Sequence, residues 1–282
     1  MRPVFHVQQL AGVYRTGATV TARVTRCATD GEAGVELWVE PHTFRVVRAR
    51  WEAYRGERVQ APPAEVGALV GLTAYFGCAR SFTEALGGFP PAVTGLFLDA
   101  VAALIQAETY LVAERGYPSL EAYAAHWQEA YRGTCRYYSH LEDVRRGWSE
   151  HAATRRAGEN LFNRFKTLAL DETEAGFLLR ASLSDSFHEM AFLLRLDTAG
   201  GEVREATGAV IRAPDRVCRE AAGYLTGLTG VRLRGAPRRE LAAALGGGEG
   251  CVHLVDLAAE AAALLDRANA VRTADRPDDG GR

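Results

Sequence analysis

Two parts of the chain carry the same order of local sequence patterns, and this repetition limits the fold more than any other feature. Residues 17–40 and 175–197 each alternate between apolar and polar side chains around a polar turn, as hairpin strands do. A third strand-like run follows at 44–51 and 202–211, and each half then holds a short helical segment ending in Ala-Leu-Gly-Gly and a long apolar one. Strands that precede helices in this way predict an α+β fold with helices on one sheet face.

We therefore predict an internally duplicated α+β protein with two three-stranded antiparallel sheets, each packed with helices. Coincidence of common patterns is the alternative explanation for the repeat. The linker between the copies is helical in period as far as residue 165, with Ser119 as its N-cap and a break at Gly133. The predicted parts are a first copy at 1–115, a helical linker at 116–160, a second copy at 161–272 and a disordered polar tail at 273–282.

The composition indicates a globular protein without a surface for polyanions. Of the 282 residues, 48% are hydrophobic and 24% charged, and the formal net charge is only -2. The first residues lack the apolar stretch and small-residue cleavage site of a secretory signal. Every basic residue except Lys166 is arginine, which is typical of GC-rich bacterial coding. We expect a cytoplasmic bacterial protein that binds neither nucleic acid nor membrane.

The cysteines do not form a disulfide pattern, because their number is odd and their spacing wide and uneven. In a reducing compartment they are free thiols, metal ligands or nucleophiles. Cys251 lies at the start of the last long helical segment, where the helix dipole favours a thiolate, and His253 follows two residues later. This pair predicts half of a metal or thiol site. A buried cysteine beside a hydrogen-bonded core histidine is the alternative.

Two further segments of the second copy offer donors. His188 and Glu189 begin an apolar strand, and because neighbouring strand residues point to opposite faces, one of them can be a bystander. Cys218 follows a Pro-Asp turn and opens a helical segment. Together with Cys251 and His253 these residues form a donor set suited to zinc or iron rather than to magnesium or calcium.

The second copy resembles known families in the segments "HEMAFLLRLD", "VCREAAGYLTGLTG" and "GGGEGCVHLVDLAAEAAALL". From about Asn160 to Ala270 it is similar to an uncharacterised bacterial domain family that carries a His-acid-Met strand start and a closing Gly-Cys-x-His-Leu motif. That family implies no activity, because its function is unknown.

The same segments also resemble the U-type scaffold proteins of iron–sulfur cluster assembly. This resemblance places Glu189 at the scaffold's aspartate, Cys218 at its middle cysteine, and Cys251 with His253 near its final pair. Phe187 stands where the first cysteine would be, and the final pair has the reverse order, so a single metal ion is expected more than a cluster. The first copy lacks these donors and is expected to support the second as a pseudo-dimer partner.

The linker clusters aromatic side chains near Cys135, including Tyr137, Tyr138 and Trp127. Aromatic residues with polar tips are common at pockets and interfaces, and core packing explains them equally well, so the linker is either a lid, a contact surface or core. Motifs of P-loop, dinucleotide-binding, zinc-protease and α/β-hydrolase proteins are absent from the sequence.

Three functions remain. The first is a zinc- or iron-binding protein, with an iron–sulfur cluster as a weaker form, whose site is catalytic, structural or serves a partner enzyme. The second is a metal-free thiol enzyme with Cys251 as nucleophile and His253 or His188 as base. The third is a non-catalytic accessory protein that docks through the aromatic linker.

Overall fold

The computed structural model describes residues 1–56, 63–199 and 201–274, with side chains as far as residue 271. The last helix extends to Ala274. Most of the predicted disordered tail therefore lies outside the described residues, as does the segment 57–62.

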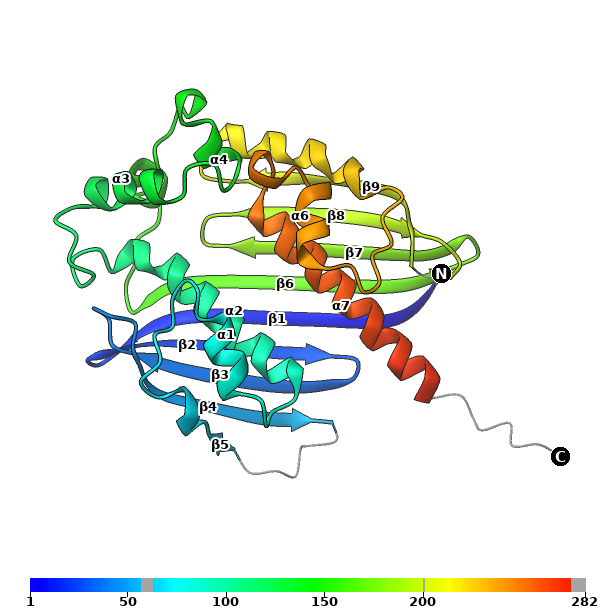
Figure 1. Ribbon diagram of the computed structural model, residues 1–282, viewed down its shortest axis with the longest axis horizontal. Helices are drawn as coiled ribbons and strands as arrows, with labels where there is room; N and C mark the ends of the chain where they lie inside the picture. The colour runs from blue at the N-terminus through cyan, green and yellow to red at the C-terminus, as the bar shows by residue number, and fades with distance from the viewer. Residues whose placement is uncertain (57–62, 200, 275–282) are drawn as a thin grey trace.

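One antiparallel sheet of nine strands forms the framework, in the order β5-β4-β3-β2-β1-β6-β7-β8-β9 (Figure 1). Its central pair is formed by β1 and β6, which pair from Arg2 with Glu172 to Tyr14 with Asn160. The strands are β1 (Arg2–Thr16), β2 (Thr19–Ala28), β3 (Gly31–Val39), β4 (Val46–Arg55), β5 (Ala64–Glu65), β6 (Asn160–Thr173), β7 (Gly176–Asp185), β8 (Glu189–Leu196) and β9 (Val203–Arg212).

This single sheet confirms a mixed fold with antiparallel strands, but the prediction of two three-stranded sheets is wrong. The sequence patterns missed β1 and β6, the two strands that join the halves, and residues 160–165 are strand rather than helix. Strand β6 hides its alternation, because Lys166 points inward at 4% exposure while Phe165 points outward at 55% exposure. An internal duplication remains a prediction.

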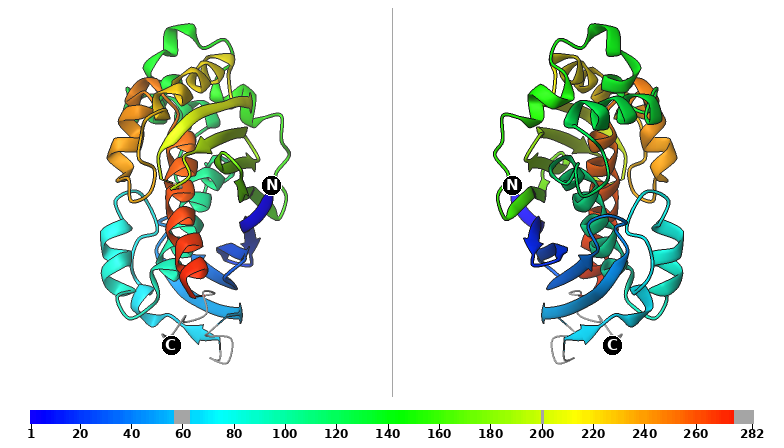
Figure 2. Two further views of the ribbon diagram at one scale, coloured as in Figure 1. Left: turned by 90° about the vertical axis from the view of Figure 1, so that its right-hand side faces the viewer. Right: turned by 90° about the vertical axis from the view of Figure 1, so that its left-hand side faces the viewer.

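The helices lie on one face of the sheet, as Figures 1 and 2 show. The longest, α2 and α7, contact strands of the first and second half, respectively, and both reach the central pair. The helices outside the linker are η1 (Gly67–Leu69), α1 (Ala79–Ala85), α2 (Pro91–Ala107), η2 (Glu108–Tyr110), η4 (Arg216–Leu228), α6 (Arg238–Ala244), η5 (Gly247–Glu249) and α7 (Val252–Ala274).

A buried charge cluster lies where α2 and α7 meet the central strand β6. Lys166 Nζ donates to Asp99 Oδ1 on α2 at 2.7 Å and also pairs with Glu260 on α7. Gln9 of β1 donates to the other oxygen of Asp99 at 2.8 Å. A buried lysine needs such partners, because an unpaired charge in an apolar core is costly. The cluster thus ties both halves together.

The linker after η2 holds short helices rather than one long one. Ser119 caps the first of them as predicted, because its Oγ accepts a hydrogen bond from the Ala122 N–H at 3.2 Å. Gly133 follows the end of that helix with a φ of 76°. The linker elements are α3 (Leu120–Ala130), α4 (Arg136–Ser139), η3 (Leu141–Asp143) and α5 (Trp148–Ala152).

Among the described residues, one helical stretch, Pro91–Tyr110, is long and apolar enough to cross a membrane by length and composition. Its most apolar window is 56% buried inside the fold, where α2 packs on the sheet. A core helix of a soluble domain meets the same criteria. Localisation in the cytoplasm remains a prediction.

Candidate functional site

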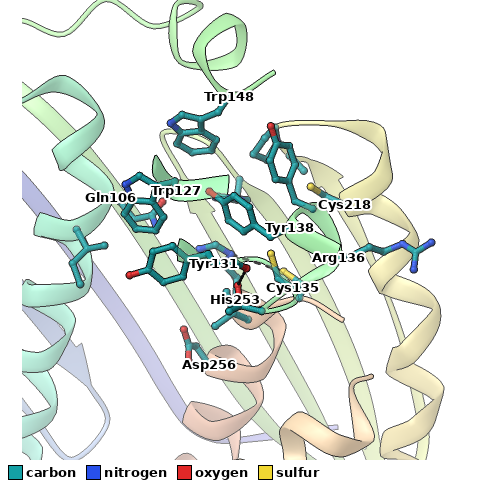
Figure 3. Close-up of a pocket in the computed structure, with 18 of the residues that line it drawn as sticks. Gln106, Trp127, Tyr131, Cys135, Arg136, Tyr138, Trp148, Cys218, His253 and Asp256 are labelled. Carbon is teal, nitrogen blue, oxygen red and sulfur yellow. Dashed lines mark hydrogen bonds between the residues drawn. The ribbon is translucent and has the colours of Figure 1, made fainter. Parts of the chain in front are cut away.

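A cavity of about 350 Å³ lies between the end of α2, the linker, η4 and the start of α7 (Figure 3). Most of its wall is apolar, and aromatic rings contribute much of it. The linker supplies Trp127, Tyr131, Tyr138 and Trp148, and α2, η4 and α7 supply Gln106, Cys218 and Asp256. Such a concave apolar pocket with a few polar groups is the usual form of a small-molecule site.

Asp185, at the end of β7, organises the floor of this cavity. Its Oδ1 accepts the backbone N–H groups of Phe187 at 2.8 Å and His188 at 2.6 Å. Its Oδ2 accepts Arg164 Nε at 3.0 Å and a second Arg164 N–H at 2.6 Å. Burial alone would raise the pKa of Asp185, but Arg164 and His188 outweigh it and hold that pKa well below its usual value. Asp185 is therefore a fixed carboxylate.

His188 stands beside this carboxylate and against a second imidazole. Its Nδ1 lies 3.2 Å from Asp185 Oδ1, so a hydrogen on Nδ1 is donated to this carboxylate. The rings of His188 and His253 have centroids 4.1 Å apart. One donor atom from each of Asp185, His188 and His253 lies within 4.8 Å of the others. Two imidazoles of the floor, one from the β7–β8 turn and one from α7, thus lie close to the Asp185 carboxylate at the end of β7.

Cys251 directly precedes α7, and its carbonyl accepts the Val255 N–H of the first turn at 3.1 Å. Burial raises the pKa of Cys251 to about 12, although the N–H groups of Leu254 and His253 favour the thiolate. The prediction that Cys251 ionises easily is therefore wrong, because loss of water outweighs the helix start. Its Sγ lies 3.8 Å from His253 Nδ1.

Two more thiols line the same cavity. Cys218 comes from η4, and burial also raises its pKa to about 12, which favours the protonated thiol over the predicted thiolate. Cys135 comes from the linker, where burial likewise raises the thiol pKa. The Arg136 N–H donates to the Gly250 carbonyl at 2.9 Å, which puts Cys135 and Cys251 on directly hydrogen-bonded segments.

Four of the five predicted residues, Cys218, Cys251, His253 and His188, line this one cavity. Glu189 does not line the cavity; its side chain is 45% exposed and lies 3.9 Å from Arg212. Sequence reasoning missed Asp185 and Arg164. The signal for Asp185 was the "SDSFH" turn, because an aspartate that begins a tight turn accepts the next backbone N–H groups.

The linker closes the cavity from above. Trp127 stacks on Tyr131 with centroids 4.3 Å apart, and Trp148 packs on Phe187 at 4.9 Å. Ser139 Oγ donates to the Gly248 carbonyl at 2.8 Å, which holds the linker to the loop before α7. Figure 3 shows Arg136 directed away from the cavity toward η4, where it pairs with Glu220.

Comparison with known proteins identifies only the second half. Residues 168–265, about a third of the chain, match a family described as "Protein of unknown function (DUF2889)". The predicted similarity of this half to an uncharacterised family is thereby confirmed. The matched segment contains both histidines, Asp185, Cys218 and Cys251, whereas the aromatic linker lies outside it. No curated protein and no solved structure matches the chain, so the resemblance to U-type scaffolds remains a prediction.

Proposed function

We propose that the chain binds a zinc or iron ion at the floor of the cavity through His188, His253 and Cys251, with Cys218 or Cys135 as a further ligand. The contact of Cys251 Sγ with His253 Nδ1 carries the proposal. Its 3.8 Å is close to the separation of about 3.5 Å expected for a thiolate and an imidazole on one tetrahedral zinc ion. An iron–sulfur cluster held by the same residues is the less favoured alternative.

The protonation states agree with a resident cation. Burial lowers the pKa of His253 well below its usual value, so the imidazole is neutral, which is the ligating form. Cys251 and Cys218 are half-buried, and the loss of water raises the pKa of each thiol to about 12, so both thiols are protonated at neutral pH. A divalent cation that displaces two thiol protons would leave a site with no net charge, which an apolar cavity accommodates far better than separate thiolates.

Asp185 supports this proposal as an orienting group. Its oxygens already accept bonds from Arg164, from His188 Nδ1 and from two backbone N–H groups. A carboxylate that fixes the far nitrogen of a histidine is the usual partner of a metal-bound imidazole. Three protein ligands would leave an open position facing the cavity, as in catalytic sites, whereas four would form a closed structural or storage site for a partner enzyme.

Elemental analysis and the absorption spectrum of protein purified without air test the proposal. We expect about one ion per chain, with colour separating iron from zinc, and loss of that ion in Cys251→Ala and in His253→Ala. Cys27→Ala is the matched control, because Cys27 is an exposed thiol on β2. Circular dichroism would establish that the variants fold. Folded Cys251→Ala and His253→Ala with unchanged metal content would contradict the proposal.

A metal-free thiol enzyme is the second candidate. The same Cys251–His253 contact favours it, since an imidazole within reach of a thiol can act as its base. The raised pKa of Cys251 opposes it, because a protonated thiol is a poor nucleophile. Alkylation with iodoacetamide separates the candidates: selective, rapid labelling of Cys251 at neutral pH in protein without metal would replace the metal proposal, and labelling no faster than that of Cys27 would exclude the thiol enzyme.

Two wider proposals accompany the site. The halves share the order strands, 3-10 helix, short helix and long helix, which supports an internal duplication and a pseudo-dimer. A non-catalytic accessory role is the third candidate, and a stoichiometric partner that co-purifies with the chain and with Cys251→Ala alike would support it.

A further inference from the structure

The upper wall of the cavity has a chemistry different from that of its floor. We propose that this part of the pocket binds a neutral aromatic small molecule that carries an oxygen acceptor, such as an aryl ketone, ester or ether. The inference does not rest on the metal, because it follows from the residues contributed by the linker and α2.

The size of the cavity sets the bulk of this ligand. A dry apolar cavity of roughly 150 Å³ is known to admit benzene. A space of about 350 Å³ therefore holds a molecule about twice as large, such as a bicyclic or substituted aromatic ring. Part of a longer, flexible ligand would extend beyond the cavity.

The shape and chemistry of the wall favour a flat ring. Trp127 and Tyr131 are stacked with an interplanar angle of 21°, and Phe76 packs against them at 5.6 Å and 5.0 Å. Stacked and edge-on ring contacts of this kind extend readily to a ligand ring. Rigid aromatic side chains also lose little conformational entropy when a ligand binds.

The charges of the wall exclude an ionic ligand. Each arginine, aspartate or glutamate that lines the described cavity is already paired with an opposite charge. These pairs are Arg164 with Asp185, Arg136 with Glu220 and Glu249, and Asp256 with Arg238. A charged ligand would enter an apolar space without a free counter-charge, which is unfavourable.

Three side chains that line the cavity, Trp127, Tyr137 and Arg136, each carry a buried polar atom without a hydrogen-bond partner in the described part of the chain. The indole Nε1 of Trp127 is buried and makes no hydrogen bond within the described part of the chain. An indole N–H is only a donor, and a buried donor without an acceptor is costly. A carbonyl or ether oxygen on the ligand would satisfy it, which is why we specify an acceptor.

Fluorescence titration with prodan, a neutral naphthalene ketone, tests the inference. We expect saturable binding with a blue-shifted emission. Ala102→Phe should abolish it, because Ala102 lines the cavity on α2 and a phenyl ring there would fill the space. Trp127→Phe keeps a ring and removes the N–H, so it should weaken prodan binding about fivefold while leaving displacement by naphthalene, which has no acceptor, unchanged.

Trp38→Phe is the matched control, because Trp38 is on β3, outside the cavity lining, with Arg48 over its ring. Thermal unfolding would establish that every variant folds. Absence of saturable binding, or equal binding by folded Ala102→Phe, would overturn the inference. Titration before and after dialysis against a chelator separates the ligand proposal from the metal proposal. A metal-free chain that binds prodan supports the ligand proposal alone. A metal-loaded chain that does not bind prodan supports the metal proposal alone.

Discussion

The two halves of the sheet share one order of elements but differ at their turns and helix starts. In the first half, β2 and β3 are joined over Thr29 and Asp30, and α2 begins at Pro91. In the second, the β7–β8 turn holds Asp185 and His188, and α7 begins after Cys251. Within the described residues, groups of three metal-ligating side chains occur only outside the first half. In the second half the candidate ligands therefore lie at one turn and one helix start.

The same places in the first half serve packing between the halves. Asp30 pairs with Arg267 near the end of α7, and both side chains remain partly exposed. Conversely, Phe187 of the β7–β8 turn stacks on Tyr110 after α2. Each hairpin turn therefore meets the other half's long helix or the turn that follows it, but only the second turn also carries a buried acid and a histidine.

The largest contrast should come from removing the two turn acids. Asp185→Ala leaves the buried Arg164 guanidinium without its partner and should lower the free energy of unfolding by about 3–5 kcal/mol. Asp30→Ala breaks a partly solvated pair and should cost less than about 1 kcal/mol. Urea denaturation followed by circular dichroism measures both. Equal losses would show that the two turns do not differ in the way described.

The charge cluster at the joint of the halves should give an intermediate effect. Lys166→Met leaves Asp99 and Glu260 without their shared cation, and because both side chains are partly exposed, we expect the free energy of unfolding to fall by about 2–3 kcal/mol. Phe165→Thr, on the outward face of the same strand, is the control, and its free energy of unfolding should stay within about 0.5 kcal/mol of that of the unchanged protein. Urea unfolding followed by tryptophan fluorescence measures the loss, and a change in Lys166→Met no larger than in the control would argue against the cluster as the tie between halves.

The smallest contrast lies in the repeated Ala-Leu-Gly-Gly. Gly246 has a φ of 89° and a Cβ there would meet the Tyr224 ring at 2.7 Å, whereas at Gly87 the nearest atom is 3.4 Å away. Gly246→Ala should therefore destabilise the protein by about 1–2 kcal/mol, and Gly87→Ala by less than about 0.5 kcal/mol. Thermal melts compare the two; a similar cost at both positions would mean that the identical motifs also share one conformation.

The sequence predicts most outer strands, the long helices and the Ser119 cap, because these rest on local periodicity and local hydrogen bonds. It does not predict β6, where Lys166 faces the core. The partners of Lys166 are 67 and 94 residues away, so no local pattern reveals why a charge is buried there. Without β6 the pairing with β1 is also lost, and two separate sheets result.

The sequence likewise reveals only part of the candidate site. Cys218, Cys251, His253 and His188 are visible in the sequence because each belongs to a donor type at an element boundary. The role of Asp185 depends on Arg164 from the neighbouring strand, and the proximity of Cys135 depends on a backbone contact of the linker with Gly250. The ionisation of Cys251 also depends on tertiary burial, which a helix-start argument alone cannot weigh.

The roof and the floor of the cavity belong to separate stretches of the chain. His188, Cys251 and His253 of the floor lie within the segment shared with an uncharacterised family, while Trp127, Tyr131, Tyr138 and Trp148 lie outside it. Selection can therefore change the aromatic side chains of the linker without changing the thiols and imidazoles beneath them. Relatives that keep these residues and exchange the intervening stretch would retain the same thiols and imidazoles beneath a different set of aromatic side chains.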